Sequence, residues 1–220
     1  MNRKKLIFDM DGTLLDSMFM WNNFLDLYKN FEMKEDAQDN IPDVVKSSSL
    51  LYSVQLVKDY LNELLTDQEI ARKIHAFLFE FYSSENRAKK HVEETIKKLY
   101  DMGYELYIAT ATDYCYAVEG VKTANLSKYF KKIYTPDTIN IKKHNIEYYS
   151  YIAEDLQIPA EELVFFDDAS YAVELAKKAN YQTVGVFDHN SNEVTTVKKV
   201  SDYFIDDFSQ LEGALRKIEN

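Results

Sequence analysis

The sequence contains little cysteine, proline or glycine, and it has no long hydrophobic run. Its 220 residues include one cysteine, three prolines and five glycines. Cys115 cannot form an intrachain disulfide, which favours a reducing, cytoplasmic location, and without a flanking histidine we expect it to be a buried, inert thiol. No apolar stretch approaches the length of a membrane span, and the amino terminus reaches Asp9 too early for a secretion signal.

Positive charge is also scarce. The chain has 26 lysines and arginines against 37 aspartates and glutamates, a formal net charge of −11. Nucleic acid needs a basic face to neutralise its phosphates, so we expect no nucleic-acid partner. An anionic membrane surface is disfavoured for the same reason. A small anion can still bind where a metal ion and a few cations are supplied locally, and we expect a monomer.

Short apolar runs of the kind found in buried parallel strands recur along the chain. They lack clean alternation, as strands covered on both faces do: KLIFD, ELYIATA, ELVFFDD and TVGVFD. Helical patterns separate them: HVEETIKKLYDMG, which stops at Gly103, NIEYYSYIAEDLQIP, and YAVELAKKAN, where Asn180 can take the left-handed stop. Strands that alternate with helices predict an α/β fold, a doubly wound, mostly parallel, Rossmann-like sheet.

Residues 18–87 interrupt this alternation, because they contain no convincing strand. Three stretches there are typical of amphipathic helices: MFMWNNFLDLYKNF, VVKSSSLLYSVQLVKDYLNELL and TDQEIARKIHAFLFEFYSS. Thr66 followed by Glu69 fits a capping box that opens the last of them. We therefore expect an α/β core domain built from residues 1–16 and 88–220, with a small all-helical cap domain formed by residues 17–87.

Polar residues follow three of the predicted strands, at the edge where a parallel sheet binds its ligands. The first strand ends in Asp9-Met10-Asp11-Gly12-Thr13, the second in Thr110-Ala111-Thr112-Asp113, and LVFF ends in Asp167-Asp168. A lysine pair, Lys142-Lys143, stands before the helix that precedes LVFF. Together these residues supply carboxylates, hydroxyls and an ammonium group at one edge of the sheet.

This set of groups suits phosphoryl transfer. Side chains two residues apart in an extended chain point the same way, so Asp9 and Asp11 can face one substrate. Clustered carboxylates repel one another unless a cation lies among them, and oxygen ligands favour Mg²⁺. A carboxylate held in this way can attack phosphorus, while a lysine and hydroxyl donors offset the charge of the transferring group. Gly12 permits a turn whose backbone N–H groups approach a phosphate.

The same motifs resemble those of the haloacid dehalogenase superfamily of phosphotransferases, in order and over the whole chain. FDMDGT resembles the signature loop, YIATAT the second motif, and KHNIEYYSYIAEDLQIPAEELVFFDDA the third and fourth. The helical insert is similar to the cap that lies between the first two strands of one large subfamily. That subfamily contains phosphoglycolate-type phosphatases, sugar-phosphate phosphatases and β-phosphoglucomutase.

The resemblance implies a role for each acidic residue. Asp9 would be the nucleophile and a Mg²⁺ ligand. Asp11 would be the general acid/base, and its backbone carbonyl would also bind the metal. Asp168 would be a further metal ligand, which Asp167 assists directly or through water.

The remaining positions would hold the phosphate and the substrate. Thr110 takes the phosphate-binding hydroxyl role, and counting back from Leu156, the end of the helix pattern, selects Lys143 over Lys142 as the phosphate-binding lysine. The family usually has Gly-Lys-Pro where this chain has Lys-Lys-His. The other expected substrate-binding positions are Gly12, Thr13, Ala111 and Thr112.

These roles predict a Mg²⁺-dependent phosphomonoester hydrolase that acts on a small phosphorylated metabolite through an aspartyl-phosphate. The alternative is a sugar phosphomutase of the β-phosphoglucomutase kind, but such mutases carry a histidine where this chain has Trp21. A haloalkanoic acid dehalogenase would lack the second aspartate, Asp11. A non-catalytic binding module on this fold would usually lack one of the two signature aspartates.

Two short links, near Asp16-Ser17 and near Arg87-Ala88, join the predicted cap to the core. Substrate has to enter between the two parts, and closure around it would exclude bulk water. We therefore expect the cap to rotate as a rigid body about these links. The alternative is a cap that a large apolar interface fixes to the core.

Overall fold

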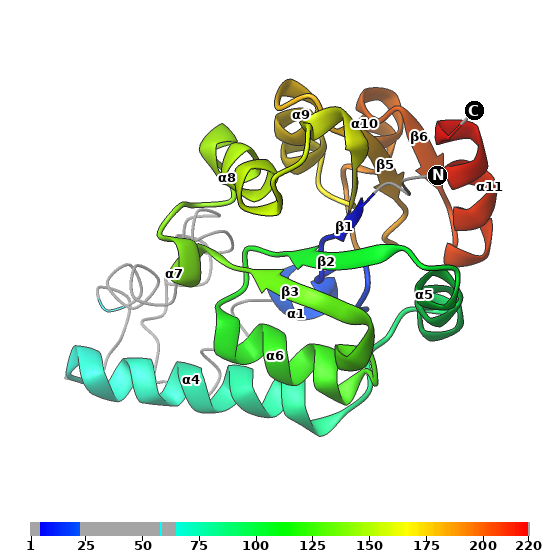
Figure 1. Cartoon of the computed structure of the whole chain (residues 1–220). Coiled ribbons are helices and arrows are strands. Elements are labelled where there is room, and N and C mark those ends of the chain that lie inside the picture. The colour runs from blue at the N-terminus through cyan, green and yellow to red at the C-terminus, as the bar shows by residue number, and fades with distance from the viewer. Residues whose placement is uncertain (1–4, 23–57, 59–64, 220) are drawn as a thin grey trace.

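The computed structural model describes residues 5–22, 58 and 65–219. Six strands form one sheet in the order β3-β2-β1-β4-β5-β6, and every neighbouring pair is parallel (Figure 1). The strands are β1 Lys5–Phe8, β2 Glu105–Ala109, β3 Phe130–Tyr134, β4 Leu163–Asp167, β5 Gln182–Val186 and β6 Tyr203–Ile205. The predicted doubly wound α/β fold is therefore confirmed.

Helices connect the strands, and several of them begin or end at residues that commonly cap helices. Their bounds are α1 Met18–Asn22, α4 Asp67–Ser84, α5 Val92–Asp101, α6 Tyr114–Thr123, α7 Pro136–Ile139, α8 Ile146–Leu156, α9 Ser170–Lys178, α10 Val194–Val200 and α11 Leu211–Ile218. Short 3₁₀ helices cover Ser127–Tyr129, Ala160–Glu162 and Phe208–Gln210. The predicted capping box of Thr66 and Glu69 opens α4. Gly103 and Asn180 follow α5 and α9 with positive φ, as predicted.

The sheet is buried on both faces, which explains its continuous apolar runs. On one face Phe8 and Phe166 join a cluster with side chains of α4, α5, α6 and α11, whereas on the other Ile7 and Phe165 pack with side chains of α8 and α9. Successive residues of a strand point to opposite faces of the sheet. Because both faces are buried, the two neighbours Ile7 and Phe8 have to be apolar, and so do Phe165 and Phe166. The rings of Phe8 and Phe166 stack with centroids 4.4 Å apart, which ties β1 to β4.

The sequence did not predict β3 and β6, the two edge strands of the sheet. Strand β3 reads FKKIY, and both of its lysines are exposed. Strand β6 has only three residues, two of them half-buried. Edge strands are commonly short or charged, so they lack the apolar run that marks a central strand.

Within the predicted cap, the structure describes α1, residue 58 and α4 with its flanks, and these described residues contain no strand. Most of the first predicted helix and nearly all of the second lie outside the described residues. The two links run side by side: the Asp16 N–H donates to the Arg87 carbonyl at 2.8 Å, and the Lys89 N–H donates to the Leu14 carbonyl at 2.9 Å. The domain boundaries stay a prediction.

Helix α4 lies along α6 (Figure 1), and its residues Ile74, Leu78 and Tyr82 belong to the same apolar cluster as the sheet. This arrangement agrees with an apolar interface between α4 and the core. Rotation of the whole cap stays a prediction, and it would have to separate α4 from α6.

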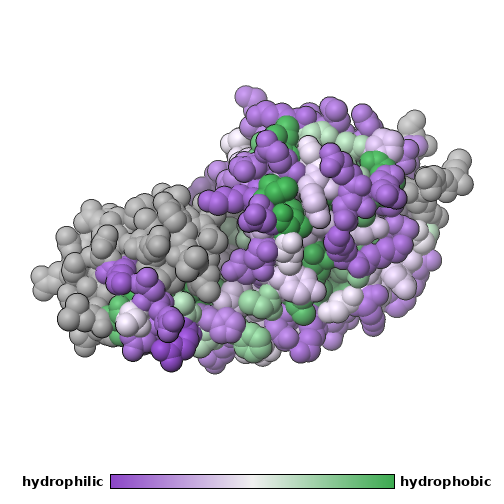
Figure 2. All heavy atoms as spheres, turned by 60° about the vertical axis from the view of Figure 1, so that its left-hand side comes forward, coloured by the Kyte–Doolittle hydropathy of each residue, from purple (hydrophilic) through white to green (hydrophobic). Residues whose placement is uncertain are grey.

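The described residues on the face shown in Figure 2 are mostly hydrophilic, with apolar side chains in small patches. Large exposed apolar side chains come from several elements: Phe19, Phe79, Tyr100, Met102, Tyr114, Ile146 and Phe187. No described helix combines the length and the apolar character that a membrane crossing needs. Cys115 is exposed, so the expectation of a buried thiol was wrong, because this position near the start of α6 faces outward. Partial desolvation and Asp113 raise the pKa of the thiol, which disfavours thiolate chemistry.

Candidate active site

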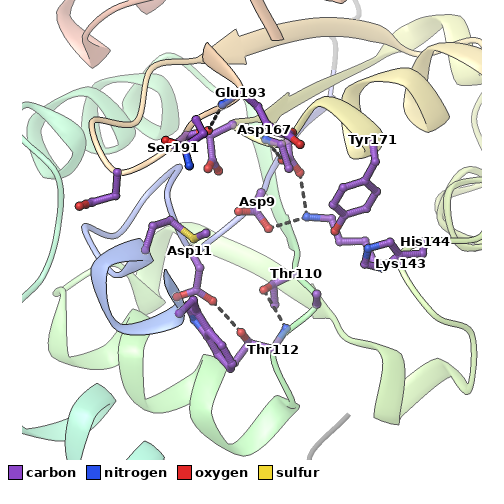
Figure 3. A pocket seen from close by; sticks show the side chains of 17 residues that line it. Asp9, Asp11, Thr110, Thr112, Lys143, His144, Asp167, Tyr171, Ser191 and Glu193 are labelled. Atoms are coloured by element: carbon purple, nitrogen blue, oxygen red, sulfur yellow. Dashed lines mark hydrogen bonds and ion pairs between the residues drawn. The ribbon is translucent and has the colours of Figure 1, made fainter. Parts of the chain in front are cut away.

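A cavity of about 360 Å³ opens at the carboxyl ends of the strands (Figure 3). Its described walls come from the segments after β1, β2, β4 and β5, from the segment before α8, from α1 and from the beginning of α9. The chain reverses its direction of travel across the sheet between β1 and β4, since β2 and β3 lie on one side and β5 and β6 on the other. Open parallel sheets bind ligands at such a point.

Lys143 links two acidic residues at the centre of this cavity. Asp9 directly follows β1, and its N–H donates to the Phe166 carbonyl at 2.8 Å. The ammonium of Lys143 donates to Asp9 Oδ1 at 2.5 Å and to Asp167 Oδ2 at 2.7 Å. Lys143 is only 3% exposed, whereas Lys142 is exposed. The structure therefore brings Lys143, and not Lys142, to the acidic residues.

The pKa values at this centre follow from burial and from the neighbouring charges. Burial alone would lower the pKa of Lys143, but Asp167 and Asp9 outweigh it and hold that pKa well above its usual value. Burial raises the pKa of Asp9 to about 8, against the opposing charge of Lys143 and with the support of Asp167 and Asp11. Burial and the neighbouring acidic residues therefore favour the neutral form of the Asp9 carboxyl group.

Three buried carboxylates could hold a divalent cation. Asp9, Asp167 and Asp168 each offer an oxygen atom, and these atoms lie within 4.8 Å of one another. Burial, reinforced by Asp167 and Asp9, raises the pKa of Asp168 well above its usual value. A set made only of oxygen ligands, which repel one another without a cation, fits Mg²⁺. The Asp11 side chain is outside this trio, and the expected role of its backbone carbonyl stays a prediction.

The turn after Asp11 supports Asp168. Gly12 has a φ of +84°, and a Cβ at this position would lie 2.3 Å from Asp168 Oδ2, so the conformation and the close approach both require glycine. The hydroxyl of Thr13 donates to Asp168 Oδ1 at 3.0 Å. Gly12 and Thr13 thus both lie against Asp168, and their expected contact with the substrate stays a prediction.

The carboxylate of Asp11 is turned toward Thr112 (Figure 3) and accepts three hydroxyl hydrogen bonds. Ser17 and Tyr82 donate to Oδ1 at 2.6 and 2.7 Å, and Thr112 donates to Oδ2 at 2.6 Å. Burial raises the pKa of Asp11, and these three hydrogen bonds oppose the shift. The sequence did not single out Ser17 or Tyr82, since one lies in a link and the other in an ordinary helical pattern.

The residues after β2 form one wall of the cavity. Thr110, Ala111 and Thr112 all line it, as their predicted roles require. The Thr110 N–H donates to the Tyr134 carbonyl at 3.1 Å, and the Thr110 hydroxyl oxygen accepts from the Thr112 N–H at 3.1 Å. Because that oxygen already accepts a hydrogen bond, its own proton can point toward a ligand.

Other parts of the wall were not predicted. The His144 ring stacks on Tyr171 with centroids 3.9 Å apart and an interplanar angle of 6°. The polar segment 190–193, after β5, closes another side. The only signal in the sequence was the unusual histidine after Lys143, and it did not indicate which residue would stack on it.

Lys89 is a further residue that the sequence did not identify. Its ammonium donates to the carbonyls of Gly12 and Phe187 at 2.6 Å each, and it lies 3.1 Å from Asp188 Oδ2. It thereby fastens the turn after Asp11 to the segment after β5. Nothing in the local sequence distinguishes this lysine from the exposed lysine that follows it.

Comparisons with known proteins agree with this geometry. The family model described as haloacid dehalogenase-like hydrolase matches residues 6–186. A phosphorylated carbohydrates phosphatase from Thermotoga maritima is 25% identical over 196 residues, which cover 86% of this chain and 87% of that protein.

Two solved structures share the fold. The β-phosphoglucomutase of Clostridium difficile has a TM-score of 0.75 at 17% identity, over 99% of this chain and 97% of that one. YfnB from Bacillus subtilis, solved with bound magnesium, has a TM-score of 0.73 at 19% identity, over 98% of this chain and 100% of that one.

Proposed function

The chain belongs to the haloacid dehalogenase-like hydrolase family, and we propose that it is a Mg²⁺-dependent phosphatase that hydrolyses a small phosphorylated metabolite through an aspartyl-phosphate on Asp9. The observation that carries the proposal is the convergence of Asp9, Lys143, Asp167 and Asp168 in one cavity. A nucleophile, a fixed positive charge and carboxylates for a divalent cation are the groups that phosphoryl transfer requires. The name of the Thermotoga maritima relative supports a phosphate ester as the substrate.

Each group has a distinct task in the proposed reaction. Asp9 attacks phosphorus as the ester P–O bond breaks, and Asp11 gives its proton to the leaving oxygen. Asp11 then takes a proton from the water that attacks the aspartyl-phosphate, which releases phosphate and restores Asp9. Lys143 and the Thr110 hydroxyl offset the charge on the transferring group. Mg²⁺ held by Asp9, Asp167 and Asp168 would supply further positive charge at the phosphoryl oxygens.

Trp21 favours a hydrolase over a phosphomutase. It lines the cavity, and its indole nitrogen donates to the Tyr82 hydroxyl at 3.1 Å. An indole has no basic nitrogen, so Trp21 cannot take the part of the histidine that the mutases carry. The presence of Asp11 likewise favours phosphate chemistry over dehalogenation.

Phosphate release from a panel of esters, with Mg²⁺ and with EDTA, tests the proposal. We expect release from p-nitrophenyl phosphate and from at least one sugar or carboxylic-acid phosphate, loss of it in EDTA, and recovery on adding excess Mg²⁺. Inactivity on the whole panel with Mg²⁺ would instead favour a binding module. Activity on 2-chloropropionate in EDTA would indicate a dehalogenase. Conversion of glucose 1-phosphate to glucose 6-phosphate with a bisphosphate primer, faster than phosphate release, would indicate a mutase.

A further inference from the structure

A buried tyrosine from the predicted cap contacts the proposed general acid/base. Tyr82 lies near the end of α4, is 1% exposed, and donates its hydroxyl proton to Asp11 Oδ1 at 2.7 Å. Asp11 follows β1, 71 residues earlier in the chain. This hydrogen bond therefore joins a helix of the insert to the residue on which proton transfer depends.

Trp21 fixes the direction of this hydrogen bond. An indole nitrogen can only donate, so the Tyr82 oxygen accepts the proton of Trp21 Nε1 at 3.1 Å. The phenol is then free to donate its own proton, and Asp11 Oδ1 is where that proton points. A chain of two hydrogen bonds, from Trp21 through Tyr82 to Asp11, has one consistent direction.

Packing holds the Tyr82 ring in place. A Cβ on Gly120 of α6 would lie 2.8 Å from Tyr82 Cδ1, so the ring presses against the backbone of that helix. On another side, the Phe81 ring meets it edge-on with centroids 5.1 Å apart. The hydroxyl therefore has little freedom to leave Asp11.

The two oxygens of Asp11 have unequal surroundings. Ser17 and Tyr82 both donate to Oδ1, whereas Thr112 alone meets Oδ2. An oxygen that already accepts two O–H hydrogen bonds is a poor place for a proton. The Thr112 hydroxyl can rotate to accept instead of donate, so Oδ2 is the oxygen that can be protonated.

We propose that Tyr82 is a positioning residue for Asp11, which reserves Oδ1 as an acceptor and leaves Oδ2 to carry the catalytic proton. The inference rests on the proposed function. As Asp9 bonds to phosphorus and the ester P–O bond breaks, the proton on Oδ2 moves to the leaving oxygen. The two hydroxyls at Oδ1 stabilise the carboxylate that remains.

The identity of the leaving group provides the test. An alkoxide needs a proton in order to leave, whereas p-nitrophenolate leaves without one. We expect Tyr82→Phe to lower kcat/KM for an alkyl phosphate that the wild type hydrolyses by about 10- to 100-fold. For p-nitrophenyl phosphate we expect a change of less than about threefold. The value of kcat/KM depends only on the steps up to formation of the aspartyl-phosphate. Hydrolysis of that intermediate is the same for both esters, and it therefore does not hide the difference between their kcat/KM values.

Tyr116→Phe is the matched control. Tyr116 is 2% exposed in α6 and also bonds across to α4, through His75 Nδ1 at 2.9 Å, but its hydroxyl has no described contact with Asp11. We expect this variant to preserve the ratio of the two kcat/KM values. Trp21→Phe provides a second test that keeps the Tyr82 side chain, and it should shift the ratio in the same direction by a smaller factor.

A merely structural role for Tyr82 would lower both kcat/KM values alike. Proportional losses, or no loss, in Tyr82→Phe would overturn the inference while leaving the proposed function intact. If Tyr82→Phe does not fold, Trp21→Phe takes its place. An unchanged ratio of the two kcat/KM values in Trp21→Phe would then overturn the inference. A wild-type protein that hydrolyses no ester would remove the proposed function first, and the inference with it.

Discussion

Asp9→Asn is expected to lower kcat/KM for every hydrolysed phosphate ester by about 10⁴-fold or more. An amide cannot form the aspartyl-phosphate, and in the proposed reaction the other described carboxyl groups of the cavity serve as the general acid/base and as metal ligands. Lys143 keeps its ion pair with Asp167, so the variant should fold. Phosphate release from p-nitrophenyl phosphate, together with a circular dichroism spectrum, measures both effects.

Asp101→Asn is a suitable control for this variant. Asp101 is exposed at the end of α5 and pairs with Lys97 one turn away, where solvent screens the interaction. We expect wild-type kcat/KM from it. Wild-type-like turnover in Asp9→Asn would rule out the proposed nucleophile.

The second large effect concerns stability. We expect Lys143→Met to lower the free energy of unfolding of the metal-free protein by about 3–5 kcal/mol, because it leaves buried carboxylates without their counter-charge. The neighbouring substitution Lys142→Met removes an exposed charge and should change that free energy by about 0.5 kcal/mol or less. Urea unfolding of both variants in EDTA compares two adjacent lysines that the sequence alone barely distinguishes.

The loss of unfolding free energy in Lys143→Met should also depend on pH. Burial raises the pKa of Asp9 from its ordinary value of 3.8 to about 8 in the folded protein, so the cost of burying Asp9 grows as the pH rises from 3.8 and is complete above about 8. Lys143 opposes this shift, so we expect the pKa of Asp9 to be higher still in Lys143→Met. As the pH falls through about 8, Asp9 takes up a proton and no longer carries a charge that needs a partner. The difference between variant and wild type should therefore be smaller at lower pH. Equal losses of unfolding free energy in Lys143→Met and Lys142→Met would contradict this account. A loss in Lys143→Met that grows as the pH falls would contradict it as well.

The sequence predicted the parts of the fold and of the site that local pattern determines. Strands β1, β2, β4 and β5 lie in the sheet interior, so burial on both faces leaves an apolar run in each. Residues at the ends of such strands meet at one edge by topology. This is why Asp9, Thr110 and Asp167 could be grouped before any side-chain positions were known.

The parts that depend on packing between distant segments could not be predicted. Ser17 and Tyr82 reach Asp11 from a link and from a helix of the insert, and Lys89 joins two loops that are far apart in the chain. In the helical pattern of α4, the sequence does not distinguish Tyr82 from the other buried positions of the helix. The direction of its hydroxyl depends on Trp21 and on the contact with Gly120, and neither partner has a sequence signature.

The covalent state of Asp9 during turnover tests the central claim most directly. Wild-type protein with Mg²⁺ and a hydrolysed ester is quenched rapidly in acid and digested with trypsin. Tandem mass spectrometry then examines the peptide that contains Asp9. We predict one phosphoryl group on the Asp9 side chain, absent when EDTA replaces Mg²⁺ and absent from Asp9→Asn. Phosphate release without phosphorylated protein, or a phosphoryl group on Asp11 or another residue, would contradict the account.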